Sequence, residues 1–125
     1  MTPKELVQNL YQSDAFTNVE TMKSYLHPEM LLDWNSSKGF YQMNTDKVLE
    51  LTEKFSIGYS YSRIKISHIL AEGNLVSLRY SHFVKTIENP SEEMLLAHFI
   101  VIWEIKDGKL FRGYQMSKLS EQKTE

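Results

Sequence analysis

Apolar residues in the first half of the chain recur mainly at helical spacing. The Thr2–Glu5 capping box, with proline at the first helical position, predicts a helix over about residues 3–12. A second capping box at Thr17–Glu20 begins a short helix that Pro28 cannot continue. Short polar cap candidates before another apolar repeat predict a third helix over residues 44–58. The first half of the chain is therefore expected to be mainly helical.

One short apolar segment, Met30–Trp34, interrupts these helices. It is too short for a helix between Pro28 and the polar cluster Asn35–Gly39. We therefore predict a strand that ends in a turn, with Asp33 near the end of the strand.

The second half of the chain has the pattern of an antiparallel β-meander. Turn-forming residues at Gly73, Asn89–Ser91 and Asp107–Gly108 separate the apolar segments. The predicted strands cover residues 60–71, 75–88, 93–106 and 109–118. Alternation about Gly73 predicts that one face carries Ile64, Ile66, Leu70, Val76, Leu78, Tyr80, His82 and Val84.

The Asp107–Gly108 pair also predicts the register of the last two strands, because it is typical of a two-residue type I′ turn. Such a turn places Lys106 opposite Lys109, and a regular ladder follows from there. On the apolar inner face, this register pairs Trp103 with Arg112, Val101 with Tyr114, and Phe99 with Met116.

The opposite face of the last two strands is also apolar, because it carries Ile100, Ile102 and Phe111. A face of this kind needs cover from outside the domain or from a partner subunit. A homodimer through this outer sheet face is the simplest cover.

Composition and charge narrow the classes of function. The 125 residues are 42% hydrophobic and 24% charged, which suits one globular domain over 1–125 with a frayed polar tail at 119–125. A net charge of −2 provides no basic field for a phosphate backbone, so nucleic acid is not expected as a partner. The chain has no Cys and no apolar run of membrane-spanning length. We therefore expect a cytoplasmic protein without membrane contact.

Three helices interrupted by one strand, then a meander that closes with Trp103–Leu110, resemble the nuclear transport factor 2-like superfamily. SnoaL-like polyketide cyclases and ketosteroid isomerase-like proteins are its nearer branches. The resemblance covers residues 2–118 in element order, with Leu31–Gly39 and the Asp-Gly-Lys hairpin as local signatures. It implies an α+β, cystatin-like fold, in which a curved antiparallel sheet wraps around the three helices into a cone with an apolar pocket. Members include isomerases, cyclases, dehydratases and binding modules, so the fold does not settle the function.

The resemblance implies a catalytic carboxylate near the end of the first strand, where Asp33 lies. The neighbouring Leu32 and Trp34 would partly desolvate this carboxylate, which would suit it to shuttle a proton near neutral pH. The alternative is an Asp that bonds the backbone of the following turn.

An isomerase also needs donors aimed at the oxygen on which charge develops. The resemblance places a tyrosine donor close to Tyr11, on the inner face of the first helix. The second, protonated acid of ketosteroid isomerases falls near Val101, which donates no hydrogen bond, so a steroid-type enolisation with that oxyanion hole is not expected. Further ligand contacts are expected from the sheet and its first strand, with ordinary core packing as the alternative: Trp34, Tyr80, Val101, Trp103 and Tyr114.

His82 falls on the inward face of its strand, and dehydratases of the superfamily use histidine in such a pocket as a proton shuttle. His82 is either an acid/base group of the pocket or a hydrogen-bonded core histidine. His98 lies on the next strand but on the face of Ile100, away from the pocket. Arg112, expected opposite Trp103, is either an anchor for a carboxylate or phenolate ligand or a rim residue with a hydrated guanidinium.

Together these residues favour a domain that binds a small, largely apolar molecule. Its chemistry would be cofactor-free proton transfer of isomerase, cyclase or dehydratase type, by Asp33 assisted by Tyr11 or His82. No metal is expected, because the histidines lack ligand spacing and thiolates are absent. The alternative is a non-catalytic ligand-binding or dimeric protein-interaction module. The expected pocket requires Trp103 and Tyr114 on the same wall.

Overall fold

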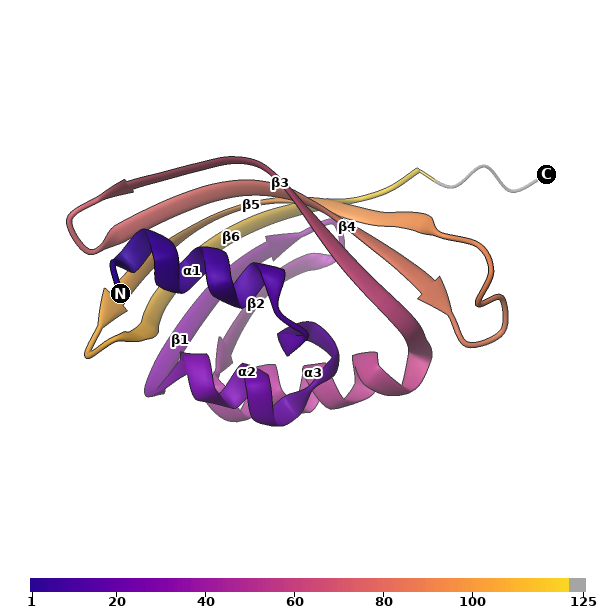
Figure 1. The fold of residues 1–125 in the computed structure, drawn as a ribbon, viewed down its shortest axis with the longest axis horizontal. Coiled ribbons are helices and arrows are strands. Elements are labelled where there is room, and N and C mark those ends of the chain that lie inside the picture. The colour runs from indigo at the N-terminus through magenta and orange to yellow at the C-terminus, as the bar shows by residue number, and fades with distance from the viewer. Residues whose placement is uncertain (122–125) are drawn as a thin grey trace.

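A computed structural model describes residues 1–121 and shows helices packed against one face of a single curved sheet (Figure 1). The helical elements are α1 (Pro3–Gln12), the 3₁₀ helix η1 (Ala15–Thr17), α2 (Val19–Tyr25) and α3 (Thr45–Gly58). The strands are β1 (Leu26–Ser36), β2 (Gly39–Asn44), β3 (Tyr59–Glu72), β4 (Leu75–Thr86), β5 (Met94–Lys106) and β6 (Lys109–Leu119). The predicted α+β fold, with a curved sheet around the helices, is confirmed.

Polar caps determine where the helices begin. The Thr2 hydroxyl accepts a hydrogen bond from the Glu5 backbone N–H at 3.1 Å, and the Glu5 carboxylate accepts one from the Thr2 N–H at 2.9 Å. Asn44 caps α3, as predicted. The cap of α2 is Asn18 and not Thr17, which belongs to η1, so α2 begins one residue later than the predicted capping box.

The sheet is mixed, whereas the sequence predicted a purely antiparallel one. Its strand order is β2-β1-β6-β5-β4-β3, and β3 to β6 form the predicted meander. β1 runs parallel to its neighbour β6. β2 pairs antiparallel with β1 where only a turn and a loop were predicted. Most β2 side chains are exposed, so this strand lacks the apolar alternation that marks the others.

The Asp107–Gly108 turn forms as predicted, with positive φ at both residues (55° and 69°) and Lys106 opposite Lys109. The regular ladder predicted beyond this turn is wrong. Phe111 is an extra residue on β6, a β-bulge that shifts every later pair by one position.

Residues of β6 beyond the bulge therefore face the side opposite to the predicted one. Gly113, and not Arg112, lies opposite Trp103, while Arg112 lies opposite Glu104. The extra Phe111 side chain contacts the His27 ring at a centroid distance of 4.8 Å and the Arg112 guanidinium at 3.9 Å. These contacts stabilise the bulge on the outer side of the sheet.

A second bulge lies in β3. The β3–β4 register shifts between Ile66 and His68, so Ser67 is the extra residue. Leu70, predicted with the inward apolar set, is instead 71% exposed. The remaining members of that set on β4, from Val76 to Val84, alternate inward as predicted.

Gly113 leaves the space that the Trp103 indole occupies. A Cβ atom on Gly113 would lie 2.5 and 2.7 Å from two indole carbons and 2.8 Å from Leu32 Cδ1. Trp103 and Leu32 are the neighbours of Gly113 on β5 and β1. The indole therefore packs over the glycine of the middle strand, and a side chain there would displace it.

The outer face of β5 and β6 carries exposed apolar side chains, as predicted for Ile100 and Ile102. Because of the bulge in β6, Tyr114 and Met116 join them, and we call these four residues the outer patch. Their exposed fractions are 54% (Ile100), 44% (Ile102), 51% (Tyr114) and 66% (Met116).

The predicted tail, 119–125, lies only partly within the described residues, since β6 extends to Leu119 and residues 122–125 lie outside them. Within residues 1–121, no helix has the length and apolar character needed to cross a membrane.

Candidate functional site

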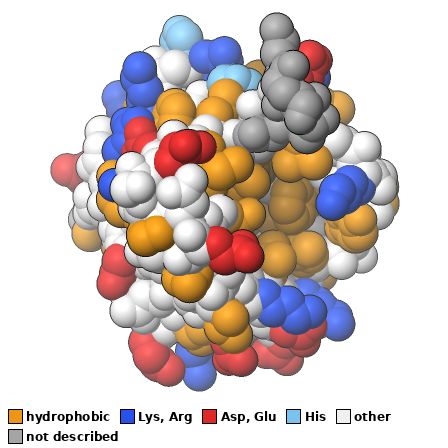
Figure 2. All heavy atoms as spheres, turned by 90° about the vertical axis from the view of Figure 1, so that its right-hand side faces the viewer, with side chains coloured by type: hydrophobic (Ala, Val, Ile, Leu, Met, Phe, Trp, Pro, Cys, Tyr) orange, Lys and Arg blue, Asp and Glu red, His pale blue; other side chains and the backbone are white. Residues whose placement is uncertain are grey.

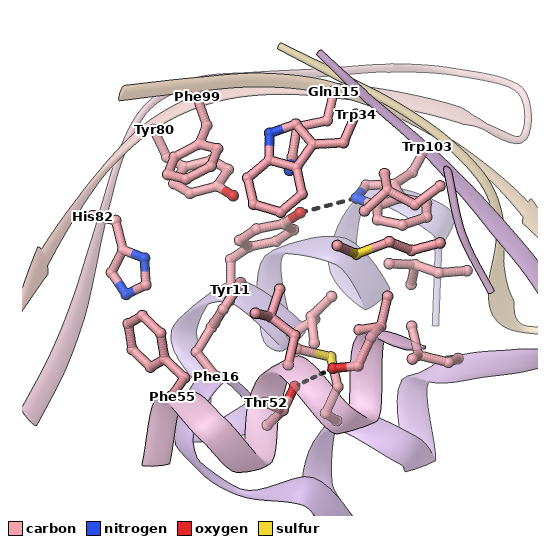
Figure 3. A pocket seen from close by; sticks show the side chains of 18 of the residues that line it. Tyr11, Phe16, Trp34, Thr52, Phe55, Tyr80, His82, Phe99, Trp103 and Gln115 are labelled. Carbon is pink, nitrogen blue, oxygen red and sulfur yellow. Dashed lines mark hydrogen bonds between the residues drawn. The ribbon is translucent and has the colours of Figure 1, made fainter. Parts of the chain in front are cut away.

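A pocket of about 180 Å³ lies between the inner face of the sheet and the helices (Figure 3). Its walls are mainly aliphatic and aromatic, and among the described residues no Asp, Glu, Lys or Arg lines it. Leu51 of α3 lines the pocket and is 40% exposed, so the pocket is open to solvent. Figure 2 shows hydrophobic side chains around a hollow on the right-hand side of Figure 1. The pocket includes both tryptophans of the chain, Trp34 and Trp103.

Two tyrosines bring hydroxyl groups into this apolar space. α1 turns Tyr11 inward, and its hydroxyl accepts a hydrogen bond from Trp103 Nε1 at 2.9 Å. The centroids of the Tyr80 and Tyr11 rings lie 4.8 Å apart. Burial raises the pKa of Tyr11 to about 12, although the hydrogen bonds with Trp103 and Tyr80 lower it in part, and burial raises the pKa of Tyr80 well above its ordinary value. Both phenols therefore keep their protons at neutral pH.

His82 lines one end of the pocket and is only 3% exposed. Its ring stacks on Phe55 at a centroid distance of 5.2 Å and meets Phe16 edge-on at 5.4 Å (Figure 3). Its Nε2 lies 2.6 Å from the Ser62 hydroxyl, while Nδ1 has no hydrogen-bond partner among the described residues. Burial lowers the pKa of His82 to about 4, so the imidazole is neutral at pH 7.

Gln115 is a pocket residue that sequence reasoning missed. It is 8% exposed and lines the pocket, and among the described residues its amide has no hydrogen-bond partner. The regular β5–β6 register predicted from the sequence places Gln115 on the outer face of the sheet. Gly113 was the available signal, because a glycine within a strand often marks a bulge or a close approach. A register with Gly113 opposite Trp103 turns Gln115 inward.

The structure does not bring Asp33 to the pocket. Its neighbours Leu32 and Trp34 line the pocket, whereas Asp33 points to the other face by strand alternation. There its Oδ1 accepts a hydrogen bond from Gln42 Nε2 at 2.9 Å. The predicted position as a desolvated pocket carboxylate is therefore wrong.

Three further candidates also lie away from the pocket. Val101 is fully buried but does not line it. Tyr114 belongs to the outer patch, so the expectation that it shares a wall with Trp103 is wrong. Arg112 donates a hydrogen bond to the Glu29 carbonyl at 2.8 Å and does not lie opposite Trp103. The pocket exists nevertheless, because the bulge exchanges these β6 side chains for Gly113 and Gln115.

Tyr11, Trp34, Tyr80, His82 and Trp103 are the predicted site residues that the structure does bring together. They come from α1, β1, β4 and β5, so only the folded chain assembles them. The Trp34 Nε1–H donates to the Ser117 hydroxyl at 2.8 Å, which fixes the indole in the wall. Within residues 1–121, no group of three potential ligands from His, Asp and Glu could hold a metal ion.

Comparison with known proteins gave matches in structure only. No family model and no curated protein matches the sequence. Among solved structures, IdmH, a proposed polyketide cyclase from Streptomyces antibioticus, is 15% identical with a TM-score of 0.73, over 94% of this chain and 92% of IdmH. A SnoaL-like protein from Shewanella denitrificans OS-217, also a proposed polyketide cyclase, is 11% identical with a TM-score of 0.70, over 92% and 89% of the two chains.

An LEH-like epoxide hydrolase from M. tuberculosis is 15% identical with a TM-score of 0.68, over 92% of this chain and 81% of that protein. These likenesses confirm the predicted nuclear transport factor 2-like, SnoaL-like fold. At such low identity they show the fold and not the activity.

Proposed function

We propose that the protein binds one small, uncharged, largely apolar molecule in the pocket between the sheet and the helices. The observation that carries the proposal is an open pocket with aromatic walls and no charged side chain among the described residues. An apolar cavity of about 150 Å³ accommodates one benzene molecule. The volume of about 180 Å³ therefore suits a ligand with one ring and a small substituent. Structural neighbours named as a polyketide cyclase and an epoxide hydrolase support a small-molecule role for this fold.

We further propose cofactor-free proton transfer, with His82 as the base. The neutral Nδ1 accepts a proton from the carbon next to a ligand carbonyl, while the Ser62 hydroxyl holds the ring through Nε2. A phenol of Tyr11 or Tyr80, both protonated at pH 7, donates to the carbonyl oxygen as negative charge develops there. The imidazolium in this apolar site then gives the proton back to the enolate. Return to the same carbon amounts to proton exchange, and return to the far carbon of a conjugated enolate amounts to isomerisation, so the proton count balances in both cases.

Deuterium exchange of a simple ketone tests this chemistry. Acetophenone in D₂O exchanges its methyl protons when a base removes them, and proton NMR follows the loss of signal. The wild type should accelerate exchange, and His82→Gln, which keeps an amide near the Ser62 hydroxyl, should lose about 100-fold of the acceleration.

Asp33→Asn is the matched control, since Asp33 lies on the other face of the sheet. It should leave exchange unchanged. Unchanged exchange in His82→Gln contradicts the role of His82, and a large loss in Asp33→Asn would return the catalytic role to Asp33.

A second candidate function is a homodimeric interaction module. The outer patch favours it, because four large apolar side chains on adjacent strands are about half exposed or more. Ile102→Glu should then dissociate the dimer in sedimentation velocity. Ile57→Glu is the control, because Ile57 is 72% exposed on α3, away from this face. A wild-type monomer, or a dimer that persists in Ile102→Glu, contradicts this assembly.

A further inference from the structure

We propose that Gln115 recognises one uncharged oxygen group, a hydroxyl or a carbonyl, on a ring-sized ligand. The inference rests on the proposed ligand-binding function and specifies the class of ligand. Its starting point is the Gln115 side chain: the residue is 8% exposed and lines the pocket, and its amide, which keeps contact with the pocket space, has no hydrogen-bond partner among the described residues.

Among the described residues, every completely buried side-chain N or O atom has a hydrogen-bond partner, so the unpartnered amide of Gln115 must reach the pocket space. A glutamine side chain offers two N–H donors and a carbonyl acceptor, and buried polar side chains are nearly always hydrogen-bonded. Most other polar groups around this pocket have a protein partner, with Nδ1 of His82 as an exception. Trp103 donates to Tyr11, Trp34 donates to Ser117, His82 pairs with Ser62, and Thr52 donates to the Val48 carbonyl. Gln115 therefore offers hydrogen-bonding capacity that a ligand can use.

The position of Gln115 argues against a structural role. In the sheet it lies between Val101 of β5 and Trp34 of β1, so its inner-face neighbours are apolar. Figure 3 shows it beside Trp34 at the sheet side of the pocket. A methionine of similar length would pack there without leaving polar atoms unpaired. A polar amide at this place in an apolar wall therefore suits a ligand with a matching polar group.

The surroundings of Gln115 select the charge and size of the partner. An ionised ligand would enter a pocket in which no described side chain supplies an opposite charge, so its desolvation would remain uncompensated. A neutral hydroxyl donates to the Gln115 carbonyl oxygen or accepts from its N–H, and a ketone accepts from its N–H. Space for about one ring remains.

Three one-ring probes test this inference: phenol, toluene and benzoate. Phenol and toluene have nearly the same shape and differ by a hydroxyl against a methyl group, whereas benzoate carries a charge. Isothermal titration calorimetry measures affinity, and tryptophan fluorescence reports the location, because both tryptophans of the chain line the pocket. The wild type should bind phenol about tenfold more tightly than toluene, and benzoate more weakly than either.

Gln115→Met removes the amide and keeps the length of the side chain, with Gln115→Leu as a second variant if methionine disturbs folding. Either variant should bind phenol and toluene with equal affinity and should unfold about 3 °C higher, because an amide without a protein partner is replaced by an apolar group in an apolar wall. A hydrogen-bonded structural glutamine would give a lower unfolding temperature instead. Gln42→Met on the outer face is the matched control, and it should keep the tenfold preference for phenol.

The outcomes separate this inference from the proposed function. If none of the three probes binds the wild type, the ligand-binding proposal fails. If phenol and toluene bind the wild type equally, or if Gln115→Met and Gln115→Leu keep the preference, the pocket is a binding site but Gln115 does not recognise the ligand. A lower unfolding temperature in both apolar variants also overturns the inference.

Discussion

The two faces of the sheet contain the same pair of residue types in opposite environments. On the inner face, His82 lies 2.6 Å from the Ser62 hydroxyl and is 3% exposed. On the outer face, His98 lies 2.8 Å from the Ser81 hydroxyl and faces solvent. Burial lowers the pKa of His82 to about 4, so the inner imidazole remains neutral where a proton acceptor is useful. The environment, and not the residue pair, makes the inner histidine a candidate base.

The two faces also differ in the residues that β6 contributes to them, and one bulge determines this difference. Phe111 shifts the register so that Gly113 and Gln115 lie on the inner face, while Tyr114 and Met116 face outward. A regular ladder would have exchanged these pairs between the faces. The chemistry of the pocket therefore depends on a feature of the backbone that carries no function itself.

The largest expected effect comes from filling the space over Gly113. Gly113→Ala puts a methyl group within 2.8 Å of the Trp103 indole and Leu32, both held in the core. Overpacking of this kind should lower the free energy of unfolding by about 3 kcal/mol, measured by urea denaturation. The displaced indole should also change the tryptophan emission of the folded protein.

Gly58→Ala is the matched control, since nothing lies within 4 Å of a Cβ at Gly58, the last residue of α3. It should be neutral or should stabilise the protein by about 0.5 kcal/mol. A cost at Gly113 no larger than that at Gly58 would show that the inner wall is not tightly packed around the indole.

A smaller effect should appear in the pH dependence of stability. The unfolded chain protonates His82 near its ordinary pKa of 6.5, whereas the folded protein does so only near pH 4. As the pH falls below 6.5, the unfolded state binds the proton first, so stability present at neutral pH is lost. From about pH 8 to about pH 5, His82 should account for a loss of about 2 kcal/mol.

Urea denaturation at several pH values measures this loss. His82→Gln should remove it, whereas His98→Gln, the same substitution on the outer face, should retain it. If the wild type and His82→Gln lost the same free energy of unfolding on acidification, His82 would not be the cause of the loss.

Sequence patterns predicted the elements of the fold well, because capping residues, apolar periodicity and the Asp107–Gly108 turn are local signals. They also placed Tyr11 and His82 on inward faces, since each lies in an element with regular alternation. What failed depends on tertiary structure. The bulges at Ser67 and Phe111 bend and twist the sheet, and no residue type in the chain announces them unambiguously.

The missed strand β2 and the wrong position predicted for Asp33 also have causes that a local sequence pattern does not show. β2 pairs through its backbone while most of its side chains are exposed, so hydrophobic patterning does not reveal it. The place of Asp33 on the outer face follows from an alternation in which Leu32 and Trp34 take the inward positions. The expectation for Asp33 came from a resemblance in strand order, which does not determine the face of a residue.

The smallest effect compares one substitution on the two faces. Tyr11→Phe removes the oxygen that accepts from Trp103 Nε1 and leaves that N–H beside the pocket. Because the pocket admits water, part of the lost bond is replaced, and the free energy of unfolding should fall by about 1 kcal/mol. Tyr114→Phe removes a hydroxyl from a side chain that is 51% exposed, so it should change stability by less than about 0.5 kcal/mol. Equal costs would mean that the hydrogen bond between Trp103 and Tyr11 contributes no more to stability than an exposed hydroxyl does.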